Sequence, residues 1–101
     1  MNGLLGLVGL GYRGGRVVVG VDAVRKELQA GKCWCVVVAE DASARAVEKV
    51  VRLAGARGVP LVAGPRAEAL GAQLGKPPVM VVGVRDRALA GGMVSLAPVR
   101  S

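Results

Sequence analysis

Residues 35–43 read Cys-Val-Val-Val-Ala-Glu-Asp-Ala-Ser, and this stretch decides the fold class. Its first half, up to Ala39, is a run rich in β-branched residues, which is typical of a strand buried on both faces of a sheet. The polar residues that follow form a turn, in which Asp41 and Ser43 are both suitable N-cap residues. Residues 44–54 then place apolar side chains at helical spacing. The sequence therefore predicts a buried strand that leads directly into a helix.

The same alternation continues on both sides of this stretch. Further helices are expected at residues 21–30 and 66–74, from the turn at 85–87 to about residue 96, and, more weakly because of its glycines, at residues 4–10. Strands that alternate with helices indicate an α/β protein with one central sheet covered on both faces. We expect that sheet to use Val17–Val19, Val36–Val38, Leu61–Val62 and Val79–Val84.

The length and the hydrophobic content predict one domain that covers residues 1–101. A chain of 101 residues, 52% of them hydrophobic, suffices for one core and is too short for two. Its apolar runs, such as residues 79–84, are far shorter than the roughly 18–20 residues that a membrane span requires. The apolar N-terminus lacks a basic n-region and an Ala-x-Ala cleavage site, so we expect a cytoplasmic protein without a membrane partner.

The net charge points toward a polyanionic partner. Fourteen Lys and Arg against seven Asp and Glu give +7, and a small basic domain of this kind suits nucleic acid. Tyr12 and Trp34 could stack on bases, although packing is the simpler interpretation for Trp34. The alternative is that the arginines only keep an apolar chain in solution, because the sequence is rich in Arg, Gly, Ala and Val throughout.

The sequence offers no group of residues suited to catalysis or metal binding. It has no His, and Ser43, Ser95 and Ser101 have no evident partner base. Cys33 and Cys35 alone cannot supply four zinc ligands, and a disulfide between such close residues would be strained. We therefore expect two reduced thiols at the start of a buried strand, no metal, no cofactor and no enzymatic activity.

One glycine motif leaves a different interpretation open. Gly9–Gly14 matches the G-x-G-x-x-G motif of dinucleotide-binding folds, in which Leu4–Val8 would form the preceding strand. Against this, residues 16–20 are strand-like where the motif requires a helix, and a chain with 16 glycines produces such matches by chance. A dinucleotide-binding fragment remains the less favoured alternative.

Several short motifs, taken together, resemble the kink-turn RNA-binding ribosomal protein superfamily of L-seven-Ae and L-thirty-e, and its bacterial branch often called YlxQ. The resemblance implies a three-layer α/β/α sandwich of the L-thirty-e type, with a four-stranded central mixed sheet. The motifs are Leu4–Leu7, Gly20–Lys26, Gly31-Lys32, Val36–Ser43, Gly58–Pro60, Leu70-Gly71 and Gly75-Lys76.

The resemblance also implies an RNA site at the strand-to-helix junction, helped by the loop before the last strand. The superfamily pattern after the glycine is a small residue, Asn, Glu, two further residues and Lys. Here Asp22 and Ala23 stand at the Asn and Glu positions, whereas Lys26 is kept. We therefore expect contacts mainly to phosphates. The candidate RNA-binding residues are Arg16, Gly20, Val21, Asp22, Ala23, Lys26, Lys32, Gly75, Lys76 and Pro77.

The predicted function is that of a non-enzymatic, monomeric RNA-binding protein. Its RNA would be structured, either kink-turn-like or ribosomal, and its surroundings would be the ribosome or the transcription–translation machinery. A protein-interaction or scaffold domain on the same fold is the alternative, favoured by the loss of the base-reading pair at Asp22 and Ala23. A single basic face would favour RNA, whereas a large exposed apolar patch would favour protein.

Overall fold

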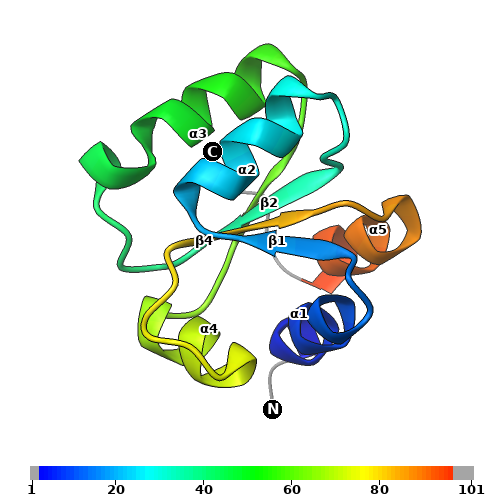
Figure 1. The fold of residues 1–101 in the computed structure, drawn as a ribbon, viewed down its shortest axis with the longest axis vertical. Coiled ribbons are helices and arrows are strands. Elements are labelled where there is room, and N and C mark those ends of the chain that lie inside the picture. Colours follow the sequence, from blue (N-terminus) through cyan, green and yellow to red (C-terminus); the bar gives the residue numbers. More distant parts are fainter. Residues whose placement is uncertain (1–2, 97–101) are drawn as a thin grey trace.

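The computed structural model describes residues 3–96, in which helices alternate with strands along the chain (Figure 1). This alternation agrees with the periodicity of the sequence. The elements are α1 (Gly3–Arg13), β1 (Val17–Val19), α2 (Val21–Gln29), β2 (Cys35–Val38), α3 (Ala44–Ala56), β3 (Leu61–Ala63), α4 (Ala67–Leu74), β4 (Val81–Val84) and α5 (Arg87–Leu96).

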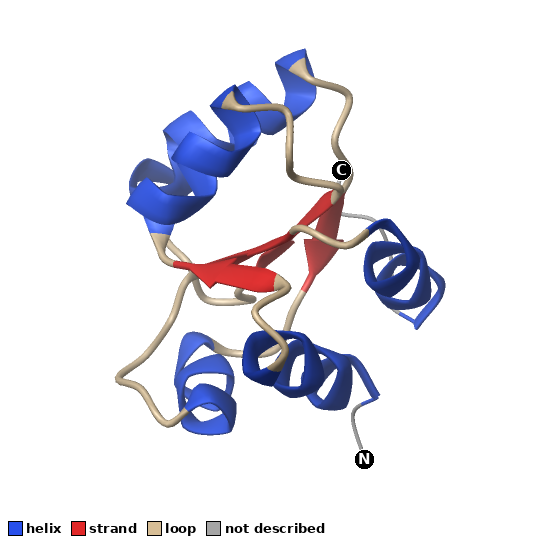
Figure 2. Cartoon of the chain, turned by 45° about the vertical axis from the view of Figure 1, so that its right-hand side comes forward, coloured by secondary structure: helices blue, strands red, loops and turns tan. Residues whose placement is uncertain are grey.

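The described strands form one mixed four-stranded sheet in the order β1-β4-β2-β3. β4 lies antiparallel between β1 and β2, and β2 and β3 are parallel. Helices α2 and α3 cover one face of the sheet, and α1, α4 and α5 cover the other (Figures 1 and 2). The three-layer α/β/α sandwich with a mixed central sheet is thus confirmed.

The valine run in β2 supplies both cores. Val36 packs into the core under α2 and α3, whereas Val37 packs into the core against α1, α4 and α5. Both residues are fully buried, because successive side chains of a strand point to opposite faces and each face here carries helices. A continuous apolar run is therefore the pattern that this position requires.

Helix α1 is longer than the sequence predicts, and Gly11 within it serves packing. A side chain at Gly11 would lie 2.5 Å from Leu89 of α5 and 2.9 Å from Val17 of β1. The missing side chain lets α1 approach both elements closely, so tertiary contact compensates for poor helix propensity. Residues 4–8 are helical where the dinucleotide interpretation needs a strand, so that interpretation is wrong.

The last strand begins later than predicted. β4 starts at Val81 instead of Val79, because the N–H of Val79 donates to the carbonyl of Ala67 in α4 (3.0 Å) and not to a strand. The segment before β4 is therefore a longer loop, residues 75–80.

The two cysteines lie on opposite sides of the sheet. Cys33 is buried toward α2 and Cys35 toward the other helices, whereas strand alternation alone would place them on the same face. Burial raises the pKa of Cys33 to about 11 and that of Cys35 to about 12. Both thiols are therefore protonated at neutral pH.

Among residues 3–96, no helix is long and apolar enough to cross a membrane.

Candidate nucleic-acid interface

The junction between β1 and α2 leaves backbone donors free at a helix N-terminus. Gly20 is the N-cap, with φ 97° and ψ 158°, a conformation that favours glycine, and it provides no side-chain cap. The first intrahelical bond runs from the N–H of Val24 to the carbonyl of Gly20 (3.0 Å). The N–H groups of residues 21–23 precede that bond and lie at the positive end of the helix dipole, where an anion is favoured.

The loop of residues 75–80 lies directly beside this junction. The N–H of Gly20 donates to the carbonyl of Val81 (3.1 Å), which joins the loop end to the helix start. The loop in turn is held on α4, where the N–H of Lys76 donates to the carbonyl of Gly71 (2.8 Å). Gly71 itself must lack a side chain, since a Cβ there would lie 2.2 Å from the carbonyl oxygen of Pro77. One end of the sheet therefore carries both predicted segments.

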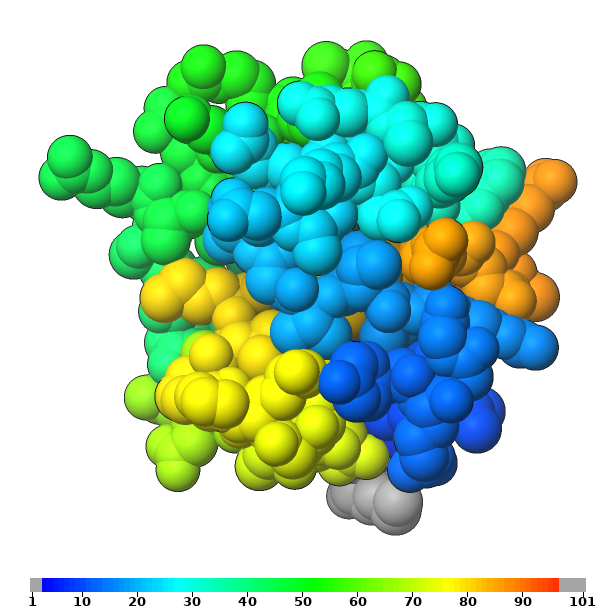
Figure 3. Space-filling model, in the orientation of Figure 1, coloured from blue at the N-terminus to red at the C-terminus, as the bar shows by residue number. Residues whose placement is uncertain are grey.

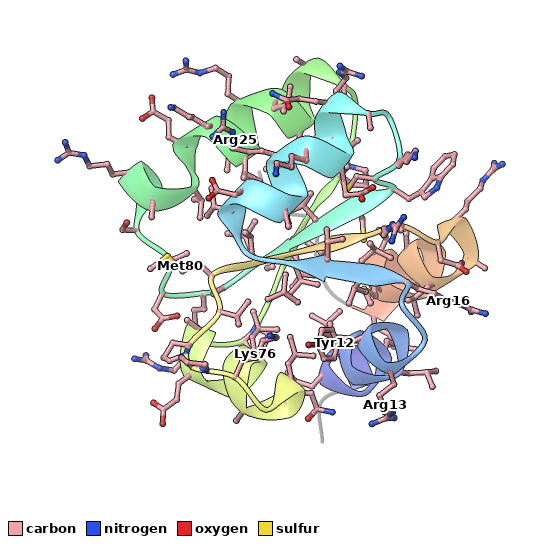
Figure 4. The ribbon with its side chains drawn as sticks, in the orientation of Figure 1. Tyr12, Arg13, Arg16, Arg25, Lys76 and Met80 are labelled. Carbon is pink, nitrogen blue, oxygen red and sulfur yellow. The ribbon has the colours of Figure 1, made fainter. Side chains whose placement is uncertain are left out.

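The two lysines of the predicted site reach this end from different layers. Lys26 is exposed on the outer face of α2, where it borders a shallow hollow of about 250 Å³ with Asp22 and Arg25. Lys76 lies on the other side of β1, with its ammonium group 5.6 Å from the ring centroid of Tyr12 in α1 (Figure 4). The space-filling view shows α2, the loop and the end of α1 as one continuous surface (Figure 3). The two lysines thus flank the junction.

The junction also carries negative charge. Asp22 is the first acidic residue of α2, its side chain is 90% exposed, and its contact with Arg25 is long, at 3.9 Å. Glu40 lies near the loop, because the backbone of the preceding Ala39 is bonded to Met80 (2.8 Å). Phosphates at this site would therefore meet N–H groups and lysines, with carboxylates between them.

Met80 and Tyr12 belong to this surface although neither is among the predicted site residues. Met80 is 39% exposed at the end of the loop, and Tyr12 is exposed beneath Lys76. The valines on both sides of Met80 are typical of a strand, so the predicted strand began at residue 79 and included Met80. The Pro77-Pro78 pair immediately before was the one signal for a longer loop.

Arg16 and Lys32 lie at the opposite end of the sheet. Arg16 precedes β1, its carbonyl accepts from the N–H of Arg85 (2.8 Å), and its guanidinium pairs with Asp86 (3.4 Å). Lys32 follows α2, whose nine residues span roughly 13 Å from the Gly20 end. Sequence distance made both residues look close to Gly20, but the strand and the helix carry them away from it.

Asp41, in the turn before α3, supports the site indirectly by capping the start of α4. Ser43 caps α3, its hydroxyl accepting from the N–H of Ala46 (3.1 Å), whereas Asp41 accepts from the N–H of Ala67 at the start of α4 (2.7 Å). This hydrogen bond, with Arg66 at 3.6 Å as a weaker influence, lowers the pKa of Asp41. The two candidate caps of the sequence thus serve different helices, and Asp41 fixes the helix on which the loop rests.

Comparison with known proteins agrees with this architecture. The chain matches the model of the Ribosomal protein L7Ae/L30e/S12e/Gadd45 family over residues 5–90. It is 34% identical over 90 residues to the RNA-binding protein YlxQ of Bacillus subtilis (strain 168), covering 89% of this chain and 90% of that protein.

Two solved structures have the same fold. A protein with unknown function from Bacillus halodurans C superposes with a TM-score of 0.88 at 26% identity, over 95% of this chain and 97% of that one. The Giardia lamblia 15.5kD RNA binding protein gives a TM-score of 0.75 at 23% identity, over 92% and 86% of the two chains. Since the family model spans most of the sequence, the chain belongs to the ribosomal protein L7Ae/L30e/S12e/Gadd45 family and is YlxQ-like.

Proposed function

We propose that the protein is a non-enzymatic, cytoplasmic RNA-binding protein that holds structured RNA at the Gly20 end of its sheet. The observation that carries the proposal is the uncapped N-terminus of α2, joined by the Gly20–Val81 hydrogen bond to a loop that carries Lys76. The names of the YlxQ relative and of the Giardia neighbour, both RNA-binding proteins, support the same partner.

Phosphate contacts follow from the chemistry of the junction. Backbone N–H groups at the start of a helix are fixed donors, and the absence of a Cβ at Gly20 lets an RNA backbone approach them closely. Lys26 lies one turn into α2 and can reach the same run of phosphates, while Lys76 extends the positive surface across β1. These donors contact phosphate oxygens and carry no base information of their own.

Base recognition would be weak and rest on the loop. Asp22 and Ala23 offer no donor to the O6 and N7 acceptors of guanine, and the Asp22 carboxylate repels phosphate. Met80 provides an exposed apolar side chain against which an unstacked base of a kink-turn-like or ribosomal RNA can pack. Binding should therefore be modest in affinity and steeply dependent on salt.

Titration of a kink-turn RNA and of a plain RNA duplex at several salt concentrations tests the proposal. Lys26→Ala should weaken both complexes by roughly 1 kcal/mol and flatten the dependence of log K on log salt by about one unit. The matched control is Lys49→Ala, which removes the same charge from the exposed face of α3. Equal effects of the two substitutions would show that the charge acts only through the net field of the protein.

A protein-interaction domain is the second candidate, because the exposed carboxylate of Asp22 stands where the superfamily reads a base. The exposed large apolar side chains, however, come from different elements, such as α1, the segment before β2, and the loop before β4. If neither RNA binds at low salt while Asp22→Lys abolishes association with a cellular protein, the scaffold function replaces RNA binding.

A further inference from the structure

The opposite end of the sheet carries an exposed aromatic side chain. Trp34 is the single tryptophan of the chain, and 46% of its surface is exposed. Its backbone N–H donates to the carbonyl of Val84 (2.8 Å), which fixes the residue at the end of β4. The guanidinium of Arg87, in the first turn of α5, lies 5.5 Å from the indole centroid. A large aromatic side chain is thus held in place without being buried.

A hollow opens beside this tryptophan. It measures about 360 Å³ and is bordered by Trp34, Gly31, Pro60 and Arg57. The guanidinium of Arg57 crosses from the end of α3 to the end of α2, where it donates to the carbonyl of Gln29 (3.1 Å). The hollow therefore has one aromatic wall and one fixed cation, which together suit a flat ring that carries a negative group.

Positive charge is in excess around the hollow. Two of the arginines there are paired, Arg16 with Asp86 (3.4 Å) and Arg85 with Glu27 (3.5 Å). Among the described residues, no carboxylate pairs with the other cations of this end, namely Lys32, Arg57 and Arg87. An exposed aromatic ring amid unpaired cations is complementary to a polyanion that has exposed rings of its own.

We infer that the Trp34 end is a second RNA contact, which takes an unpaired nucleotide. The base stacks on the indole of Trp34, and the flanking phosphates lie against Arg57, Arg87 and Lys32. Unpaired bases can stack because they are free of a helix, and stacking on aromatic and guanidinium groups is how proteins usually hold single-stranded RNA. This site shares with the proposed function the premise that the partner is RNA, but no residue is common to the two sites.

Because Trp34 is the single tryptophan of the chain, tryptophan fluorescence reports directly on this site. Adding a short single-stranded oligouridylate should quench the tryptophan fluorescence to a saturating level, because a stacked base quenches an indole. With a labelled oligouridylate followed by fluorescence anisotropy, Trp34→Ala should weaken binding by roughly five- to hundredfold, since stacking is worth about 1–3 kcal/mol per base. Trp34→Phe keeps an aromatic face and should restore most of the affinity.

Matched variants separate this site from the one at Gly20. Lys49→Ala removes a charge from the exposed face of α3, outside both sites, and should leave the quenching unchanged. Arg87→Ala removes the cation beside the indole and should reduce the quenching. Oligouridylate binding without quenching, or equal affinity of Trp34→Ala and the wild type, would overturn the inference whatever Lys26→Ala does to structured RNA. If oligouridylate quenches Trp34 while Lys26→Ala leaves the affinity for structured RNA unchanged, this inference stands and only the site at Gly20 is removed.

Discussion

The two ends of the sheet present positive charge in different ways. At the Gly20 end the donors are backbone N–H groups at the start of α2, next to the loop of residues 75–80. Lys26 and Lys76 lie beside them, and so does the Asp22 carboxylate. At the Trp34 end the surface consists of side chains, an indole with arginines around it. A site made of backbone tolerates the exchange of side chains, so its capacity for phosphate can outlast the loss of the residues that read bases. A site made of side chains can be removed by one substitution.

Gly71→Ala should have the largest effect, and it acts on the Gly20 end alone. The new methyl group would meet the Pro77 carbonyl, displacing the loop and costing roughly 1–3 kcal/mol of folding free energy. Thermal unfolding should shift down by about 4–8 °C per kcal/mol for a domain of this size. Affinity for structured RNA should fall about tenfold, whereas oligouridylate binding at Trp34 should stay unchanged.

Gly55→Ala is the control for this substitution. Gly55 is exposed in α3, and a Cβ there meets nothing within 4 Å, so alanine should stabilise the helix by up to about 1 kcal/mol. Equal unfolding temperatures for the two variants would mean that the loop does not rest on Gly71.

Paired charge removals come next, because they change binding without the loss of folding free energy expected for Gly71→Ala, and they divide the two ends. Lys26→Ala with Lys76→Ala should weaken the binding of structured RNA by roughly 2 kcal/mol. It should also flatten the dependence of log K on log salt by about two units. Arg57→Ala with Arg87→Ala removes as much charge, yet should act mainly on oligouridylate. If both pairs weaken both RNAs equally, the distinction between the two ends fails.

Much of this comparison was accessible from the sequence. The valine run of β2 predicted a strand buried on both faces, and the family motifs led to the junction and the loop. The chain order could not show that β1 and α2 carry Arg16 and Lys32 to the far end. It also could not assign Asp41 to α4, since that contact spans 26 residues. Trp34 appeared to be a packing residue because exposure depends on tertiary neighbours.

Asp22→Asn should have a smaller effect, with opposite signs for binding and stability. Removing the exposed carboxylate relieves repulsion of phosphate and should tighten the binding of structured RNA by roughly two- to fivefold. The same change removes an anion from the N-terminus of α2 and should cost about 0.3–1 kcal/mol of folding free energy. Adding Ala23→Glu should raise the preference for a kink-turn RNA over a duplex. Isothermal titration and thermal unfolding of the same variants measure both quantities. Weaker binding by Asp22→Asn would mean that the carboxylate contacts RNA favourably.

Acid should produce the smallest effect, through Asp41. The folded pKa of Asp41 lies below the ordinary value of about 3.9, so its contribution is present above that value and is lost as the pH falls through the lower folded pKa. The unfolding temperature of the wild type should therefore drop in acid more steeply than that of Asp41→Asn, whose amide oxygen can still accept from Ala67. Parallel curves for the two proteins would show that the carboxylate does not stabilise α4.

The most direct test is a nuclear magnetic resonance titration of the labelled protein with a kink-turn RNA. The backbone amides of residues 20–23 and those of Gly75, Lys76, Val79 and Met80 in the loop should shift together in proportion to bound RNA, as should the side chain of Lys26. The single indole N–H of Trp34 should stay in place until an RNA with an unpaired tail is added. Shifts confined to the Trp34 end, or spread evenly over the surface while the Gly20 amides stay fixed, would contradict the account.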